Sequence, residues 1–427
     1  MMLIWRSIDH LLPHGEPKYT NRLLLGYALT MYRHLIASLS FATLIAAACW
    51  AAAPPAPPPS APAAAAAMSI PTAPQVDARA YILVDFQTDK VLAAKEAAAR
   101  MEPASLTKLM TAYIVFQELA GGKLKLADMV TVSEHAWRSE GSRTFIELGK
   151  PVSVQDLILG MIVQSGNDAT IALAERIAGT EDTFAQLMNS NAKRLNMVGT
   201  HFENSSGLPS PQHYTTARDM SLLANAMIRD FPQYYKFYSI REFEHNGIKQ
   251  QNRNGLLEKD PSVDGLKTGH TDSAGFCLVT SAHRDGMRLV SVVMGAPSER
   301  AREEASSALL NYGYTFFESI RVKTAGTTVL KPRVYKSAGE FAAVGVSADV
   351  YALVPRGQAA AVETAARLDH EPLIAPLAAG EKLGSFTVTD GAGTVLASAP
   401  LVALAAVPQG GLWTRMVDGI ALWLRKK

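Results

Sequence analysis

The sequence predicts an α+β fold, because helix and strand patterns occupy separate stretches of the 427-residue chain. Between residues 103 and 178, apolar residues recur at intervals of three and four, the spacing of one helix face. Residues 276–294 instead hold two apolar runs around a turn, which is typical of an antiparallel hairpin. We therefore expect a domain of helices and an antiparallel sheet over residues 77–321.

Residues 1–53 predict a leader for export. Tyr32-Arg-His34 precedes an apolar run from Leu35 to Ala48, and this order of a basic end and an apolar core is typical of a secretory signal. Met31 stands where such a signal should begin, so we expect translation to start there. The alternative is one membrane span from about Leu23, which the basic residues before Leu35 would interrupt.

Residues 54–76 are rich in proline and alanine and predict an extended linker. The chain has two cysteines. Cys49 follows Ala46-Ala-Ala, an ordinary processing sequence, and lipid attachment at Cys49 is the less favoured alternative. Cys277 stands in an apolar segment and predicts a buried thiol.

The composition excludes some function classes. A net charge of +2 gives no reason to expect binding to nucleic acid. The histidines are scattered, and the sequence contains neither Cys-x-x-Cys nor His-Glu-x-x-His spacing. We therefore expect no metal and no cofactor.

A candidate nucleophile stands near the start of a predicted helix over residues 103–121. Pro103 suits the first helical turn, and the apolar pattern ends at Gly121-Gly122. Residues three apart share a helix face, so the Lys108 amine can approach the Ser105 hydroxyl and act as its base. Lys108 must be neutral to do so, and burial together with a nearby cation such as Lys267 would lower its pKa.

Ser165-Gly-Asn167 is predicted to form the bend between two helices. One helix begins at Ser153, which resembles an N-cap, and the other begins near Asp168. Polar side chains on such a bend can face a cleft, where Ser165 could pass a proton between Lys108 and a leaving amine. The Asn167 amide could hydrogen-bond to a substrate amide.

Lys267-Thr268-Gly269 precedes the predicted hairpin and is expected to form part of a strand beside it. An extended substrate could add to that strand through backbone hydrogen bonds, because Gly269 permits close approach. Thr268 and Lys267 would then lie near a terminal carboxylate. The backbone N–H groups of Ser105 and His270 are candidates for an oxyanion hole.

Ser-x-x-Lys, Ser-x-Asn and Lys-Thr-Gly in this order resemble the signature of class A β-lactamases and penicillin-binding proteins. The segments 103–112, 250–257 and 263–271 further resemble the D-alanyl-D-alanine carboxypeptidases, which are low-molecular-mass penicillin-binding proteins. The resemblance implies a β-lactamase/transpeptidase-like catalytic domain. It also implies that Ser105 is acylated, that Lys108 is its base, that Ser165 and Asn167 form the second motif, and that the substrate contacts these residues of the chain: Asn167, Arg253, Lys267, Thr268, Gly269 and Arg302.

By this resemblance we expect a serine-type hydrolase that removes the terminal D-alanine from peptidoglycan pentapeptides, is inhibited by β-lactam antibiotics, and works at the periplasmic face of the inner membrane. A β-lactamase is a near alternative, but no Glu-x-x-Leu-Asn block supplies its deacylating base. A DD-endopeptidase that cuts cross-links would use the same residues. A non-catalytic peptidoglycan-binding scaffold is a further alternative, which the intact motifs disfavour.

Residues 322–408 alternate short apolar segments with turns, such as Lys382–Thr389 before Asp390-Gly391, and predict a small β-sandwich. They contain no catalytic cluster, so we expect a spacer or interaction domain. Residues 409–427 predict an amphipathic helix that lies on anionic lipid, with packing on the β domain as the alternative. One helix face would carry Leu412, Trp413, Met416, Val417, Ile420 and Leu424, and the basic end Arg425, Lys426 and Lys427.

Overall fold

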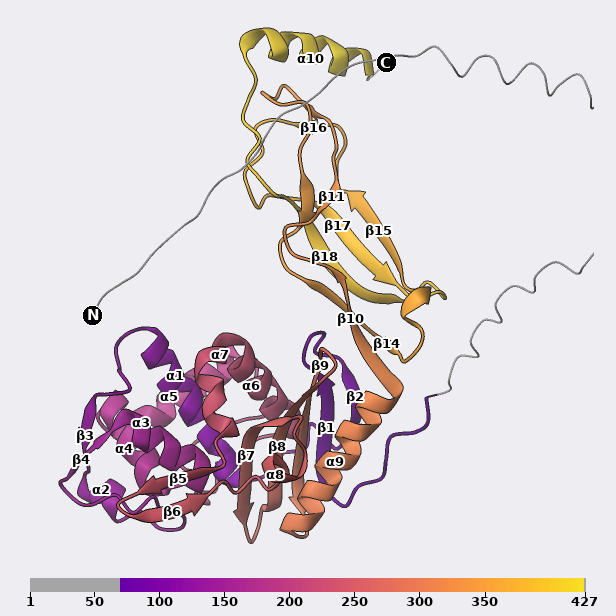
Figure 1. Ribbon diagram of the computed structural model, residues 1–427. Helices are drawn as coiled ribbons and strands as arrows, with labels where there is room; N and C mark the ends of the chain where they lie inside the picture. The colour runs from indigo at the N-terminus through magenta and orange to yellow at the C-terminus, as the bar shows by residue number, and fades with distance from the viewer. Residues whose placement is uncertain (1–69, 426–427) are drawn as a thin grey trace, which may run out of the picture. The chain divides into compact units, whose positions relative to one another are not determined.

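The computed structural model describes residues 70–425 (Figure 1). The predicted leader, its start at Met31 and Cys49 lie outside these residues. The last residues of the predicted linker form no helix or strand. They nevertheless pack on the folded domain, because the Pro71 carbonyl accepts a hydrogen bond from the Tyr312 hydroxyl at 3.1 Å.

The first domain is built around a five-stranded antiparallel sheet in the order β2-β1-β9-β8-β7. Helix α9 (Glu299–Phe316) covers one face of this sheet (Figure 1). The helical part of the domain packs on the other face and shares one large apolar core with it. The strands are β1 (Ala80–Asp85), β2 (Val91–Lys95), β7 (Val263–Thr271), β8 (Gly275–Arg284) and β9 (Met287–Ala296).

The other elements of this domain are short, except for four helices of twelve to fourteen residues. In chain order they are η1 (Ala104–Thr107), α1 (Lys108–Ala120), β3 (Met129–Thr131), α2 (Glu134–Trp137), β4 (Pro151–Ser153), α3 (Val154–Leu159), η2 (Gly160–Gln164), α4 (Asn167–Ala178), α5 (Glu181–Arg194), α6 (Ala217–Asp230), α7 (Pro232–Tyr235), η3 (Lys236–Ser239), β5 (Glu242–His245), β6 (Ile248–Gln251) and α8 (Leu256–Lys259).

The α+β prediction is confirmed, with one correction in the helix predicted over residues 103–121. The chain first makes a turn of 3₁₀ helix, and the α-helix begins only at Lys108. Pro103 precedes the turn instead of lying inside it. The predicted hairpin is also present: Asp285 and Gly286 both have positive φ, 48° and 82°, as a tight two-residue turn between β8 and β9 requires.

The C-terminal β domain is also confirmed. Its main sheet is antiparallel, in the order β11-β13-β18-β17-β15, and two pairs, β10-β14 and β12-β16, complete one apolar core. The strands are β10 (Phe317–Lys323), β11 (Thr328–Leu330), β12 (Val334–Tyr335), β13 (Val344–Val346), β14 (Val350–Pro355), β15 (Glu363–Leu368), β16 (Leu373–Ile374), β17 (Lys382–Thr389) and β18 (Val395–Ala403), with one 3₁₀ turn, η4 (Ala359–Ala361).

The last element is helix α10 (Leu412–Arg425), where an amphipathic helix was predicted. It touches the β domain through its polar face: the Asp418 carboxylate accepts the Lys336 backbone N–H at 2.5 Å and pairs with Arg333 at 3.4 Å. Most of its large apolar residues are exposed, from 46% at Val417 to 84% at Leu412, whereas Leu422 is partly buried. No helix within residues 70–425 is long and apolar enough to cross a bilayer.

Candidate active site

The candidate nucleophile Ser105 lies on the 3₁₀ turn η1, immediately before helix α1. The turn brings the Lys108 side chain back over Ser105, and Nζ lies 3.1 Å from Oγ. Lys108 is buried, with 1% of its surface exposed, whereas Ser105 reaches the surface of a cleft. The predicted pairing of Ser105 and Lys108 is therefore present, although a tighter turn than an α-helix produces it.

Lys108 Nζ has two further partners, the Asn167 Oδ1 and the Ser206 carbonyl oxygen, each at 2.6 Å. A neutral amine has two N–H groups and one lone pair. The two N–H groups fit these two oxygens, so the lone pair is left for the Ser105 hydroxyl proton. Burial, with a smaller effect of the Arg253 charge, lowers the pKa of Lys108 to about 7. The base form of Lys108 is therefore populated to about one half at pH 7.

Ser165, the first residue of the second motif, directly follows the π-helical turn η2. Its backbone is in the left-handed conformation, with φ 66°. Its hydroxyl accepts a hydrogen bond from Lys267 Nζ at 2.9 Å, and both side chains are almost fully buried. Burial and the charge of Lys108 lower the pKa of Lys267 well below its usual value. Ser165 therefore joins the third motif to the second.

Asn167 begins helix α4 and connects Lys108 to the loop over residues 140–149. Its Oδ1 accepts from Lys108, and its Nδ2 donates to the Glu140 carbonyl at 2.6 Å. The next residue, Asp168, is fully buried and accepts the backbone N–H groups of Thr144 and Phe145 at 2.8 and 2.9 Å. These contacts fix the loop at the edge of the cleft, where Ser142 lines it.

The third motif lies on β7, the edge strand of the sheet, which faces the catalytic turn. A side chain at Gly269 would stand 3.2 Å from the Ser105 nitrogen and 3.0 Å from the Pro103 carbonyl oxygen. Only glycine allows the strand to approach η1 this closely without displacing backbone atoms. The backbone N–H of Ser105 and the strand that carries the His270 N–H therefore lie next to each other.

Two arginines complete the cleft, a cavity of about 150 Å³. Arg302 on α9 is 3% exposed, its Nη2 lies 3.3 Å from Glu299 Oε1, and its Nε has no hydrogen-bond partner among the described residues. Arg253 donates from its Nε to the Gln164 carbonyl at 2.9 Å. The residues lining the cavity are Ser105, Ser142, Ser165, Arg253, Thr268, Gly269, His270, Glu299 and Arg302.

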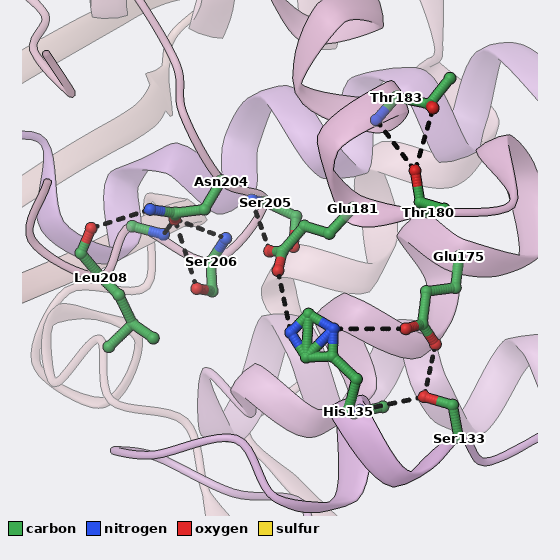
Figure 2. A network of polar contacts seen from close by, with 12 residues as sticks. Ser133, His135, Glu175, Thr180, Glu181, Thr183, Asn204, Ser205, Ser206 and Leu208 are labelled. Carbon is green, nitrogen blue, oxygen red and sulfur yellow. Dashed lines mark hydrogen bonds and ion pairs between the residues drawn. The ribbon is translucent and has the colours of Figure 1, made fainter.

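A polar network supports the carbonyl that contacts Lys108 (Figure 2). Glu181 accepts the N–H and hydroxyl of Ser205 at 2.8 and 2.5 Å, and Asn204 Oδ1 accepts the Gly207 N–H at 2.7 Å. On the opposite side, the His135 ring lies 3.5 Å from Glu181 and 3.5 Å from Glu175 (Figure 2). The network orients the Ser206 carbonyl toward the lysine.

The structure brings all ten predicted site residues to one place. Seven of them line the cavity, and Lys108, Asn167 and Lys267 lie directly beneath it. Asp168, Glu181 and Ser206 were not predicted from the sequence, because their contacts join loops that lie far apart in the chain. Within residues 70–425, no three His, Cys, Asp or Glu side chains are grouped so that they could hold a metal ion.

Comparison with known proteins gives consistent matches over both domains. The family model described as D-alanyl-D-alanine carboxypeptidase matches residues 67–298, and the model of the penicillin-binding protein 5 C-terminal domain matches residues 317–409. The chain is 41% identical to the D-alanyl-D-alanine carboxypeptidase DacA of Escherichia coli K12 over 360 residues, which cover 83% of this chain and 89% of the relative.

Solved structures agree with these matches. Penicillin-binding protein 5 from Haemophilus influenzae superposes with a TM-score of 0.75 at 41% identity, covering 79% of this chain and 99% of that one. The ampicillin-bound penicillin-binding protein D2 from Listeria monocytogenes matches with a TM-score of 0.52 at 30% identity, covering 56% of this chain and 98% of that one.

Proposed function

The chain belongs to the peptidase S11 family of D-alanyl-D-alanine carboxypeptidases, and from this premise we propose that it removes the terminal D-alanine of peptidoglycan stem peptides. The observation that carries the proposal is the contact between Lys108 and Ser105 beneath an open cleft. A buried lysine with a pKa near 7 is suited to activate a serine at neutral pH.

In the proposed acylation step, Lys108 takes the Ser105 proton while Oγ attacks the carbonyl carbon of the penultimate D-alanine. The resulting oxyanion accepts hydrogen bonds from the backbone N–H groups of Ser105 and His270. The leaving amine needs a proton when the C–N bond breaks. Ser165 and Lys267, joined at 2.9 Å, line the route by which Lys108 can return it. D-Alanine leaves, and an ester on Ser105 remains.

Water then hydrolyses the ester, with Lys108 as the base that activates it, and Ser105 is restored. A β-lactam presents a comparable amide, so we propose that it acylates the same serine. Because the sequence has no Glu-x-x-Leu-Asn block, we expect the penicilloyl ester to be cleared slowly. The ampicillin-bound relative supports binding of β-lactams by this fold.

The terminal carboxylate of the substrate is proposed to bind between Thr268 and the two arginines. Arg302 is buried, and its Nε has no hydrogen-bond partner among the described residues. A substrate carboxylate could accept a hydrogen bond from this Nε. Arg253 lines the same cavity.

The experiment is D-alanine release from a peptide that ends in D-Ala-D-Ala, with protein lacking residues 1–69. Wild-type protein should release D-alanine, and Ser105→Ala should release none. Binding of a fluorescent penicillin reports whether the wild-type protein is folded. Folded protein that binds penicillin covalently but releases no D-alanine from this peptide would instead support cleavage of cross-links.

We further propose that the protein acts at the periplasmic face of the inner membrane and contacts its surface through α10. The exposed apolar residues of α10 and the basic residue Arg425 at its end, followed in the sequence by two lysines, support this proposal. The Asp418 contacts support it as well, because they hold the polar face toward the β domain.

A further inference from the structure

A second cavity, of about 550 Å³, lies beside the catalytic turn and is not part of the cleft described above. One wall comes from the residues just before Ser105, including Arg100 and Glu102, and another from the loop that ends at Tyr214. The buried His213 contributes to this loop wall and lies 2.8 Å from the Thr107 hydroxyl, inside η1. The cavity therefore abuts the turn that carries the nucleophile.

Arg100 is held at the rim of this cavity without a carboxylate partner. Its guanidinium carbon lies 4.3 Å from the centre of the Tyr214 ring, a cation–π contact, and the side chain is exposed. No Asp or Glu of residues 70–425 forms an ion pair with it. An oriented arginine that lacks an anion is prepared to bind one, and its planar donors match a carboxylate.

The other charged groups of the cavity already have partners. Arg79 donates to the Ser273 and Ala274 carbonyl oxygens at 2.8 and 2.5 Å. Glu102 accepts the Ser273 hydroxyl at 2.5 Å. Burial lowers the pKa of His213 to about 4, so the ring is neutral at pH 7. Among these charged side chains, Arg100 is the one without a hydrogen-bond partner within residues 70–425.

Strand β7 leads from the catalytic cleft to this cavity. Gly269 stands against Ser105, and the strand ends at Thr271, two residues before Ser273 on the cavity wall. From Gly269 the strand continues for two residues to Thr271, or about 7 Å at about 3.3 Å per extended residue, and residues 272–274 then form the turn into β8 that carries Ser273. A substrate that adds to β7 as an extended strand would reach the cavity with the part of its acyl chain two to four residues before the scissile bond.

We propose that this cavity is a subsite for the acidic part of the stem peptide, and that Arg100 binds a carboxylate located two to four residues before the scissile bond. The inference rests on the proposed function, because it deepens the specificity of the same reaction. Peptides that lack this carboxylate would be bound only by the cleft around Ser105.

The test measures peptide binding separately from turnover. In the Ser105→Ala background, the dissociation constant of a stem pentapeptide is measured by calorimetry, together with that of the same peptide with its upstream carboxylates converted to amides. Adding Arg100→Gln should weaken binding of the carboxylate form about 10-fold, the typical effect of losing one charge-assisted contact, and leave the amidated form unchanged. Arg138→Gln, at an exposed arginine outside both cavities, is the matched control.

The same variants are then compared with Ser105 present. Arg100→Gln should raise KM for the carboxylate-bearing pentapeptide and leave kcat unchanged. If Arg100→Gln weakened binding of both peptides equally, Arg100 would have a structural role and the subsite would be refuted. If it weakened binding of neither peptide, Arg100 would not contact the substrate, which would also refute the subsite. If the wild-type protein bound the pentapeptide through Arg100 and yet released no D-alanine, the proposed reaction would be refuted, but the proposed subsite would not.

Discussion

If Lys108 is the base, as we propose, it sets the pH dependence of the first chemical step, because only its neutral form can accept the Ser105 proton. Burial lowers its pKa to about 7, so the neutral fraction falls as pH falls through 7. The rate constant for acylation by a fluorescent penicillin should drop about fivefold between pH 7 and pH 6, and rise about twofold from pH 7 to pH 8. Stopped-flow measurement at constant ionic strength checks this.

Lys108→Arg is the control for that profile, because a guanidinium keeps its charge at any pH at which the protein is folded. The variant should acylate at least about 10²-fold more slowly at pH 8. Unchanged acylation in Lys108→Arg, or a rate that increases toward low pH, would exclude Lys108 as the base.

Glu181 affects Lys108 in two ways, through its charge and through its contact with Ser205. Its negative charge raises the pKa of Lys108, and its Oε1 holds Ser205 beside the Ser206 carbonyl. Glu181→Gln keeps an oxygen acceptor for Ser205 but removes the charge, so the pKa of Lys108 should fall further. The acid limb of the acylation profile should move to lower pH by about a few tenths of a unit. A loss of thermal stability without such a shift would show that Glu181 is only structural.

Residue spacing predicted only the local contact of the site, whereas Ser165, Asn167 and Lys267, whose contacts span 102 and 59 positions, were named because their motifs resemble those of a known family. Lys108 is three positions from Ser105, and this spacing alone brought the pair within reach. Glu181 and Ser206 could not be predicted in the same way. Their contacts with Ser205 and Lys108 span 24 and 98 positions, and short-range patterns carry no information about such pairs.

At the scale of elements, the approach of β7 to η1 depends on Gly269. A methyl group there would meet the Ser105 and Leu106 nitrogens at 3.2 Å and the Pro103 carbonyl at 3.0 Å, so Gly269→Ala should push the strand from the turn. The His270 N–H would then leave the proposed oxyanion hole. We expect kcat for D-alanine release to fall about 10²-fold, similar to the loss of one oxyanion donor.

The matched control is Gly286→Ala in the β8–β9 turn, where no atom lies within 4 Å of the added methyl group. It should lower stability, because its φ of 82° disfavours a side chain, but leave kcat nearly unchanged. If Gly269→Ala retained full kcat and only melted at lower temperature, the strand position would not govern catalysis.

Sequence patterns predicted α1, α4 and the hairpin of β8 and β9, but the long helices α5, α6 and α9 were not predicted. The hairpin of β8 and β9 followed from two apolar runs around Asp285-Gly286. The 3₁₀ turn before Lys108 did not, because its residues are compatible with an α-helix, and the packing of Gly207 against the Ala104 carbonyl helps to define it. Strands β13, β15 and β16 were also missed, since short or exposed strands carry a weak alternating pattern.

At the scale of the whole molecule, we predict that catalysis does not depend on α10, the helix proposed to contact the membrane. Its apolar residues Leu412, Ile420 and Leu424 are 84%, 56% and 60% exposed, and none of its residues lines the catalytic cavity. Protein ending at residue 410 should therefore release D-alanine from a soluble peptide as fast as protein that retains α10. The two proteins should differ in binding to vesicles.

Co-sedimentation with vesicles containing anionic phospholipid checks this last prediction. Protein with α10 should sediment, and protein ending at residue 410 should not. Ile420→Glu places a charge on the apolar face and should release most of the protein. Asp418→Ala removes the contact with Lys336 and Arg333, so the helix loses its fixed orientation and vesicle affinity should fall several-fold while helix content is kept. Vesicle binding that survives Ile420→Glu and rises with Asp418→Ala would mean that the polar face, not the apolar one, meets the lipid.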